Sequence, residues 1–245
     1  MCFHTSIIEK VKNIELETAT QLADEKYREK FDTPQYHLNG FTHPPMLIIS
    51  QERDDLLIPA YWGIVPAYQK PDQLNAYYKK AVKFGGGLNA RDDKLFDHFI
   101  YKQSITSQKC LIPVSGFFEP HTYQKKKYPF YFKPATSKLL LLGGIYTRIE
   151  NLVTFSIITK KASSLFEKIH NLKKRQPLLF DQEVAVKWLQ SEERSAVENF
   201  LNFQFDDDQL ETYPVSKSLF SPKEESNQKD IIREENYPEL QFENL

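Results

Sequence analysis

The chain has 245 residues, enough for one large domain or two small ones, and 32 Lys and Arg against 33 Asp and Glu give a formal net charge of −1. A near-zero charge argues against a dedicated nucleic-acid binder, but it averages a basic body, +6 over residues 1–205, and an acidic tail, −7 over residues 206–245. The longest apolar run is four leucines, which excludes a membrane-spanning helix. The N-terminus lacks the pattern of a signal peptide, and the two cysteines form no disulfide framework or metal motif. Both features favour a cytoplasmic protein.

Hydrophobic periodicity and turn residues predict the elements in chain order. A first helix starts at the N-cap Asn13 and carries apolar residues at helical spacing up to Phe31. Glycines at residues 85–87 end a later helix and indicate either a tight turn or a close approach of the backbone to another group. The remaining predicted strands are residues 46–49, 56–65, 110–118, 128–132, 139–146, 153–159 and 177–180, and the remaining predicted helices are residues 72–84, 162–169, 184–189 and 195–203.

Strands and helices mix without strict βαβ alternation. This order predicts an α+β fold built around a mostly antiparallel sheet. We expect one domain over residues 1–220. Residues 221–245 are polar and acidic, which predicts a poorly ordered tail.

Cys2 directly follows the initiator methionine. If Met1 is removed, Cys2 offers an amine and a thiol on adjacent carbons, which ordinarily titrate near pH ~8 and ~8.5. An aldehyde can condense with the amine, and the thiol can then close a thiazolidine ring. Position alone favours the alternative, a cysteine that happens to lie second.

Three further positions could carry acid–base or polar chemistry. Asn89 follows the glycine run and could orient an amine. Glu119 follows a strand and two aromatic residues, surroundings that raise a carboxyl pKa and suit general acid–base work. His170 ends a helix and opens a basic loop, where it could shuttle protons. The alternatives are a loop amide, a solvent-facing carboxylate and an ordinary histidine.

Two features could bind DNA. The guanidinium of Arg91 could grip a phosphate through its planar donor fork. Trp62 and Tyr68 lie near a sharp turn, where exposed aromatic rings could stack on bases. Buried rings there would instead belong to the core, and a surface arginine needs no ligand.

The order and spacing of these signals resemble the SRAP family, named for the SOS response-associated peptidases. The resemblance covers roughly residues 1–220. It rests on Met1-Cys2, Trp-Gly-aliphatic-aliphatic-Pro at 62–66, Asn-Ala-Arg at 89–91, Cys-Leu-Ile-Pro…Gly-Phe-aromatic-Glu at 110–119, Gly-Gly-aliphatic-Tyr at 143–146, Phe-x-Ile-Ile-Thr at 155–159, Ile-His-Asn at 169–171 and Arg-x-Pro at 175–177.

The resemblance implies a barrel-like sheet and a role in the DNA damage response. Members recognise abasic sites in single-stranded DNA, especially near a junction with duplex, and crosslink to the ring-opened aldehyde through the N-terminal cysteine. The implied nucleophile is Cys2, with Asn89 orienting its amine. Glu119 would help to open the sugar ring, and His170 would contact DNA and assist proton transfer, including reversal of the crosslink.

For DNA binding, the resemblance implies that Arg91 and Arg175 hold phosphates and that Trp62 stacks near the lesion. It adds Thr159 as a contact and Pro177 as the end of its motif, and Tyr68 stands where the family often has a second tryptophan. No metal or cofactor is implied, and we expect a monomer that acts in the cytoplasm or on the nucleoid.

Several positions depart from the family pattern. Phe3-His4 replaces the usual Gly-Arg, Pro120 replaces an aromatic residue, and Gln176 replaces a methionine. Two alternatives therefore stay open. One is a cysteine-dependent peptidase or autopeptidase, a hydrolase rather than a lyase-like crosslinker. The other is a non-covalent single-stranded DNA-binding module.

Overall fold

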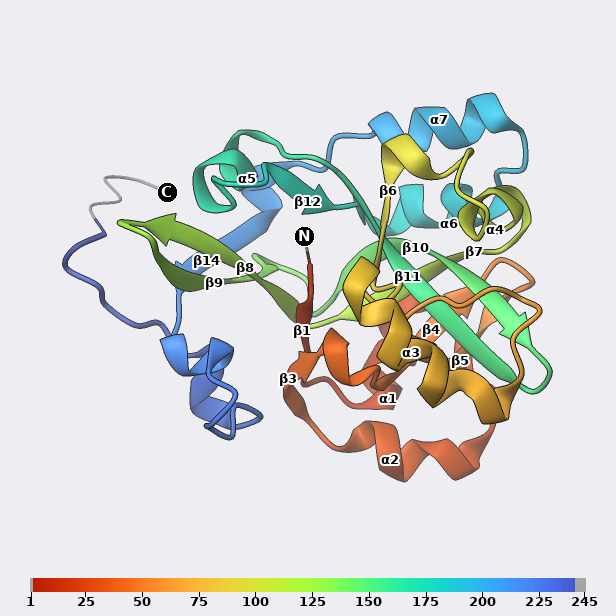
Figure 1. Ribbon diagram of the computed structural model, residues 1–245, viewed down its shortest axis with the longest axis horizontal. Coiled ribbons are helices and arrows are strands. Elements are labelled where there is room, and N and C mark those ends of the chain that lie inside the picture. The colour runs from red at the N-terminus through yellow and green to blue at the C-terminus, as the bar shows by residue number, and fades with distance from the viewer. Residues whose placement is uncertain (1, 241–245) are drawn as a thin grey trace.

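A computed structural model describes residues 2–240 of the chain, which form two β-sheets flanked by helices (Figure 1). The predicted removal of Met1 and the end of the predicted tail, residues 241–245, lie outside the described residues. The strands of the larger sheet are β2 (Gln21–Leu22), β4 (Pro45–Ser50), β5 (Arg53–Trp62), β6 (Asn89–Arg91), β7 (Lys109–Val114), β10 (Leu140–Ile149), β11 (Leu152–Lys161), β12 (Arg175–Pro177) and β13 (Leu179–Phe180).

Five strands of the larger sheet close on themselves. Their order is β11-β10-β7-β4-β5, with antiparallel pairing throughout, and β5 pairs back to β11 in parallel. Closure leaves no free edge within this ring. The prediction of an α+β fold with a mostly antiparallel, barrel-like sheet is therefore confirmed.

The smaller sheet has the order β14-β9-β8-β1-β3 and holds the N-terminus. Residues 110–118, predicted as one strand, are divided at Ser115 between β7 in the barrel and β8 in this sheet. The backbone N–H of Ser115 donates to the Ser6 carbonyl at 2.9 Å, and a side chain at Gly116 would clash with the ring of Tyr131. The strands of the smaller sheet are β1 (His4–Ile7), β3 (Gln35–Asn39), β8 (Gly116–Tyr123), β9 (Lys126–Pro134) and β14 (Leu210–Pro214).

Short helices cover the outside of both sheets (Figure 1). In the described residues, no helix is long and apolar enough to cross a membrane. The α-helices are α1 (Val11–Thr18), α2 (Arg28–Asp32), α3 (Leu74–Ala81), α4 (Tyr101–Ser107), α5 (Ser164–Ile169), α6 (Gln182–Gln190) and α7 (Arg194–Asn202), and the 3₁₀ turns η1–η8 are Glu25–Tyr27, Gly40–Thr42, Pro71–Gln73, Val82–Phe84, Asp92–Lys94, Asp207–Gln209, Lys217–Phe220 and Lys229–Ile232.

The predicted single helix from Asn13 to Phe31 is wrong. Helix α1 ends before Ala19, which adopts the left-handed conformation with φ of 53°. The chain then forms β2, whose Leu22 pairs with Leu57 of β5, before the short helix α2 begins. The apolar residues of this stretch are spaced as in a helix but serve three separate elements.

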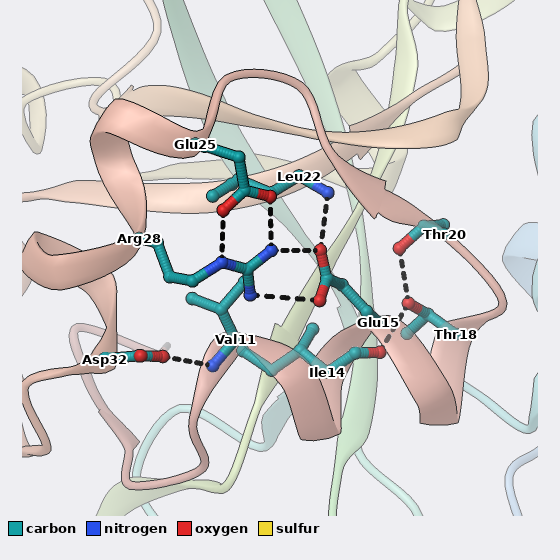
Figure 2. A network of polar contacts seen from close by, with 9 residues as sticks. All are labelled: Val11, Ile14, Glu15, Thr18, Thr20, Leu22, Glu25, Arg28 and Asp32. Atoms are coloured by element: carbon teal, nitrogen blue, oxygen red, sulfur yellow. Dashed lines mark hydrogen bonds and ion pairs between the residues drawn. The ribbon is translucent and has the colours of Figure 1, made fainter.

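A polar network fixes this turn in place of a continuous helix (Figure 2). The guanidinium of Arg28 donates to both carboxylate oxygens of Glu15, at 3.1 and 2.9 Å, and to both oxygens of Glu25, at 2.5 and 2.6 Å. The Glu15 carboxylate also accepts the backbone N–H of Leu22 at 2.8 Å. One carboxylate of α1 thus holds both the following strand and the second helix.

The other predicted helices and strands are present within a few residues of their predicted bounds. The sequence-based prediction missed short elements: β1, β3, β6, β14 and α4, which have three to seven residues each. Elements of this length carry too few residues to show a hydrophobic period. Three of them, β1, β3 and β6, lie beside the candidate site described below.

Residues 221–240, which fall within the predicted polar tail, contact the smaller sheet. Ile231 is buried in a small apolar cluster under β8 and β9. The side-chain oxygen of Asn227 accepts the backbone N–H groups of Tyr36 and His37, at 2.8 and 3.2 Å. A few anchors therefore order a segment whose overall composition is polar.

A buried histidine, His37, and a half-buried one, His4, link this segment to β1. Nε2 of His37 lies 2.8 Å from Nδ1 of His4, and its Nδ1 lies 2.6 Å from the Ser226 hydroxyl. Burial lowers the pKa of His37 to about 4 and that of His4 to about 3, and His37 adds to the shift at His4. Both rings are therefore neutral at pH 7.

We predict that the free energy of unfolding falls as the pH drops from 6.5 to about 4. Over this range the unfolded chain binds protons at His4 and His37, whereas the folded chain does not until its lower pKa values are reached. For His37 alone the expected loss is about 3 kcal/mol. Urea unfolding of the wild type and of His37→Gln at neutral and acid pH tests this. An equal pH dependence in both proteins would contradict it.

Candidate active site

The pairing of β1 with β8 brings the N-terminus close to Glu119. His4 lies opposite Phe118 in this register, so Cys2, which precedes β1, lies near Glu119 in the middle of β8. Both side chains are fully buried, and the Cys2 thiol contacts the His4 carbonyl at 3.8 Å. Burial raises the pKa of the Cys2 thiol well above its usual value, and the negative charge of Glu119 raises it further. The thiol is therefore protonated at neutral pH.

Asn89 holds the backbone of Cys2 from the opposite sheet. Its side-chain amide donates to the Cys2 carbonyl at 2.9 Å. Its side-chain oxygen is buried and has no hydrogen-bond partner among the described residues. Asn89 thus presents a buried acceptor next to the backbone of the candidate nucleophile.

The glycine turn before Asn89 sets the path of this strand. Gly87 has φ of +70°, and a side chain there would lie 2.4 Å from the Ile64 carbonyl oxygen. The Gly87 carbonyl accepts the Ile64 N–H at 3.0 Å. From this turn β6 runs parallel to β11, with Asn89 opposite Ile157. The predicted tight turn is confirmed, and close backbone approach explains the glycine.

His170 is the fourth residue of the candidate site, with Cys2, Asn89 and Glu119. Its Nδ1 lies 2.7 Å from the Arg175 carbonyl and 3.4 Å from Glu119 Oε2. A carbonyl can only accept, so Nδ1 carries the proton. Burial lowers the pKa of His170, although the charge of Glu119 opposes that shift, and the ring is neutral at pH 7 with Nε2 as its basic atom.

The predicted DNA-binding residues Arg91, Thr159 and Pro177 form one row across three strands. Thr159 of β11 lies opposite Arg91 of β6 on one side and opposite Pro177 of β12 on the other. Thr159 and Pro177 are buried, whereas the Arg91 side chain is 52% exposed. Of the three, only Arg91 presents a charge to solvent.

Two aspartates that the sequence analysis did not single out hold the predicted arginines. Asp93 makes a bidentate pair with Arg91, with both contacts at 2.8 Å. Asp92 accepts from Arg175 at 2.7 Å, and the same guanidinium nitrogen also bonds the Thr159 carbonyl. The sequence Arg-Asp-Asp signals the first pair, but nothing local signals the second, because its partners lie 83 positions apart.

Trp62 does not fit the predicted stacking role. Its side chain is fully buried, stacks on Phe155 and donates from Nε1 to the Leu88 carbonyl at 2.9 Å. No base can reach its faces, so its role is to support the chain just before Asn89. Tyr68, in contrast, is 75% exposed. A run of aromatic residues in the sequence does not distinguish these two environments.

A pocket of about 880 Å³ opens beside the group. Phe3, Phe41 and His170 line it on one side, and residues of the segment 219–227 line the other. Within residues 2–240, no group of three or more His, Cys, Asp or Glu side chains is placed to hold a metal ion. The candidate site therefore combines a thiol, an amide, a carboxylate and an imidazole, and of these four groups the imidazole of His170 lines the pocket.

The chain is similar to several known proteins. The abasic site processing proteins YoqW and YobE of Bacillus subtilis (strain 168) are each 27% identical to the chain, over 215 and 212 residues, which are 81% and 80% of this chain and 90% and 91% of theirs. A crystal structure of a protein from Bacteroides thetaiotaomicron superposes with a TM-score of 0.82 at 27% identity, over 96% of this chain and all of that one.

The family model described as SOS response associated peptidase (SRAP) matches residues 1–222. This match covers all four residues of the buried group and both sheets. The family resemblance predicted from the ordered motifs is therefore confirmed, and the chain belongs to the SRAP family.

Proposed function

We propose that this protein recognises abasic sites in single-stranded DNA and crosslinks to them through Cys2 once Met1 is removed. The product is a thiazolidine that shields the lesion. The observation that carries the proposal is the convergence of Cys2, Asn89, Glu119 and His170 from four separate stretches of the chain. The names of the relatives YoqW and YobE, both abasic site processing proteins, support it.

The first step joins the amine of Cys2 to the aldehyde of the opened sugar. The amine nitrogen attacks the aldehyde carbon, and loss of one water leaves an imine. Asn89 supports this step in two ways. Its amide already holds the Cys2 carbonyl at 2.9 Å, and its side-chain oxygen offers an acceptor for an amine N–H. Holding the nucleophile in one orientation lowers the entropic part of the barrier.

The second step closes the ring. The thiol sulfur adds to the imine carbon, and the thiol proton passes to the nitrogen, which becomes a secondary amine. Because burial and the charge of Glu119 keep the thiol protonated, this proton needs an acceptor during attack. Glu119 is the carboxylate nearest in the strand register, and neutral His170 beside it can take or return a proton.

We predict that Cys2→Ala abolishes a heat-stable adduct with an abasic single strand and leaves non-covalent binding within about twofold, since alanine keeps the backbone contact to Asn89. Denaturing gels report the adduct, and intact mass reports whether Met1 is removed. The control is Cys110→Ala, which changes the other buried cysteine, in β7.

Three outcomes would contradict the crosslinking proposal. One is an adduct formed by Cys2→Ala. Another is no adduct from wild-type protein with a free Cys2 amine, which would favour a non-covalent single-stranded DNA-binding module. The third is turnover of unrelated peptides that depends on Cys2, without any adduct, which would favour a peptidase.

We predict that Glu119→Gln slows adduct formation about 100-fold, while binding of uncleaved abasic DNA stays within about twofold. The charge of Glu119 raises the thiol pKa, so a purely electrostatic role predicts that its removal leaves the reaction unchanged or faster. A proton-transfer role predicts a slower reaction at every pH between about 6 and 8. Single-turnover rates decide between the two, and a faster variant would exclude the proton-transfer role.

We predict that Arg91→Ala weakens DNA binding and lowers the slope of log affinity against log salt by about one. The Arg91 side chain is half exposed and pairs with Asp93. Arg53 is a matched control, since it makes the same bidentate pair with the carboxylate two residues on, Asp55, and is 56% exposed. An unchanged slope in Arg91→Ala, or an equal change in Arg53→Ala, would exclude a phosphate contact by Arg91.

A further inference from the structure

Exposed aromatic rings lie in the turn that follows α3 and in the segment that precedes α4. Phe84 is 90% exposed and Phe99 is 57% exposed, and both line one pocket. Val82, two residues before Phe84, is 52% exposed. Large apolar side chains are normally buried, and a cluster left in water marks an interaction surface. We call Val82, Phe84, Phe99 and the neighbouring Lys79, Lys80 and Lys83 the α3–α4 patch.

Local structure forces Phe84 outward. Helix α3 buries Leu74 and Tyr78, and the 3₁₀ turn Val82–Phe84 continues it away from the core. Gly85, at φ of +85°, ends that turn and reverses the chain toward β6. Phe84 is thus held at the end of a rigid helical segment.

The charge on the α3 side of the α3–α4 patch has one sign, whereas the segment before Phe99 carries the exposed Asp97. From residue 73 to residue 91 the sequence has four basic residues and no acidic one. Lys79, Lys80 and Lys83 are all exposed. Aromatic rings surrounded by lysines match the two chemistries of a single DNA strand, bases that stack and phosphates that carry negative charge. A protein partner without strong acidic character would gain little from the lysines.

A pocket at the patch lies next to the strand that carries Asn89. Its volume is about 430 Å³, and Phe84, Phe99 and Lys80 line it together with Gly87 and Tyr101. The Tyr101 hydroxyl reaches the Asn89 carbonyl at 3.5 Å. Figure 1 shows α3 leading into β6 beside the N-terminus. The patch therefore borders the strand that carries Asn89 and Arg91.

We propose that the α3–α4 patch binds unpaired bases of the DNA strand that flanks the abasic site, with Phe84 and Phe99 stacking on bases and the lysines contacting phosphates. This inference rests on the proposed function, because it extends the DNA path from the same site. It adds a binding surface that the buried group around Cys2 does not supply.

The test uses strands that contain a tetrahydrofuran abasic analogue, which has no aldehyde and cannot crosslink. Affinity is measured by fluorescence anisotropy for single strands of about 6 and about 16 nucleotides. We expect the wild type to bind the longer strand about tenfold more tightly, and Phe84→Ala to lose most of that gain. Phe84 is 90% exposed, so its replacement leaves the core intact.

Two further variants sharpen the test. Lys83→Ala is expected to lower the salt slope for the longer strand by about one. Leu16→Ala is the control, because Leu16 is 71% exposed on α1 beside Glu15 and Glu17, without a lysine cluster. We expect this control to bind both strands as the wild type does.

The inference is overturned if Phe84→Ala keeps the full length-dependent gain, or if it weakens both strands equally. Adduct formation on a short reactive abasic strand separates this failure from failure of the proposed function. If the wild type forms adducts and Phe84→Ala binds both strands normally, the crosslinking proposal stands and the patch proposal fails. If the wild type forms no adduct but its length-dependent binding requires Phe84, the patch proposal stands and the crosslinking proposal fails.

Discussion

The pairing of β1 with β8 is the contact on which the candidate site depends. It fixes the first residues of the chain against β8, the strand that contains Glu119, with His4 opposite Phe118. The pairing exists because the chain leaves the barrel at Ser115 and enters the smaller sheet, where Gly116 lets the ring of Tyr131 approach. Without this change of sheet, Cys2 and Glu119 would have no common strand edge.

Strand β11 organises the opposite side of the site. It closes the barrel through β5 and also accepts β6 and β12 along its length. The first of these carries Asn89 and Arg91, and the second carries Arg175 and leads from His170. One central strand, packed in the core through Phe155 and Ile157, therefore sets the positions of residues from two remote loops. Such a rigid support holds reactive groups in register.

The four residues of the candidate site had only weak signals in the sequence, and the fold brings them together. Cys2, Asn89, Glu119 and His170 each have an ordinary alternative explanation in the sequence, and only their order indicated a family. The structure brings them together with contacts of 2.9 Å at Asn89 and 3.4 Å at His170. Trp62, in contrast, is buried and does not join the site. An aromatic side chain in a turn-rich segment can face the core as readily as solvent. Asp92 had no local signal as the partner of Arg175, because the two residues lie 83 positions apart.

By itself, the sequence determined the α+β class, most of the longer helices and strands, the tight glycine turn and the family to which the chain belongs. These follow from local periodicity, from turn chemistry and from the order of motifs along the chain. Only the tertiary structure decided where the helix after Asn13 breaks, which side chains are buried, and how residues 221–240 pack. These depend on partners far apart in sequence, such as Leu22 with Leu57 and His37 with Ser226, whose pairing no local pattern encodes.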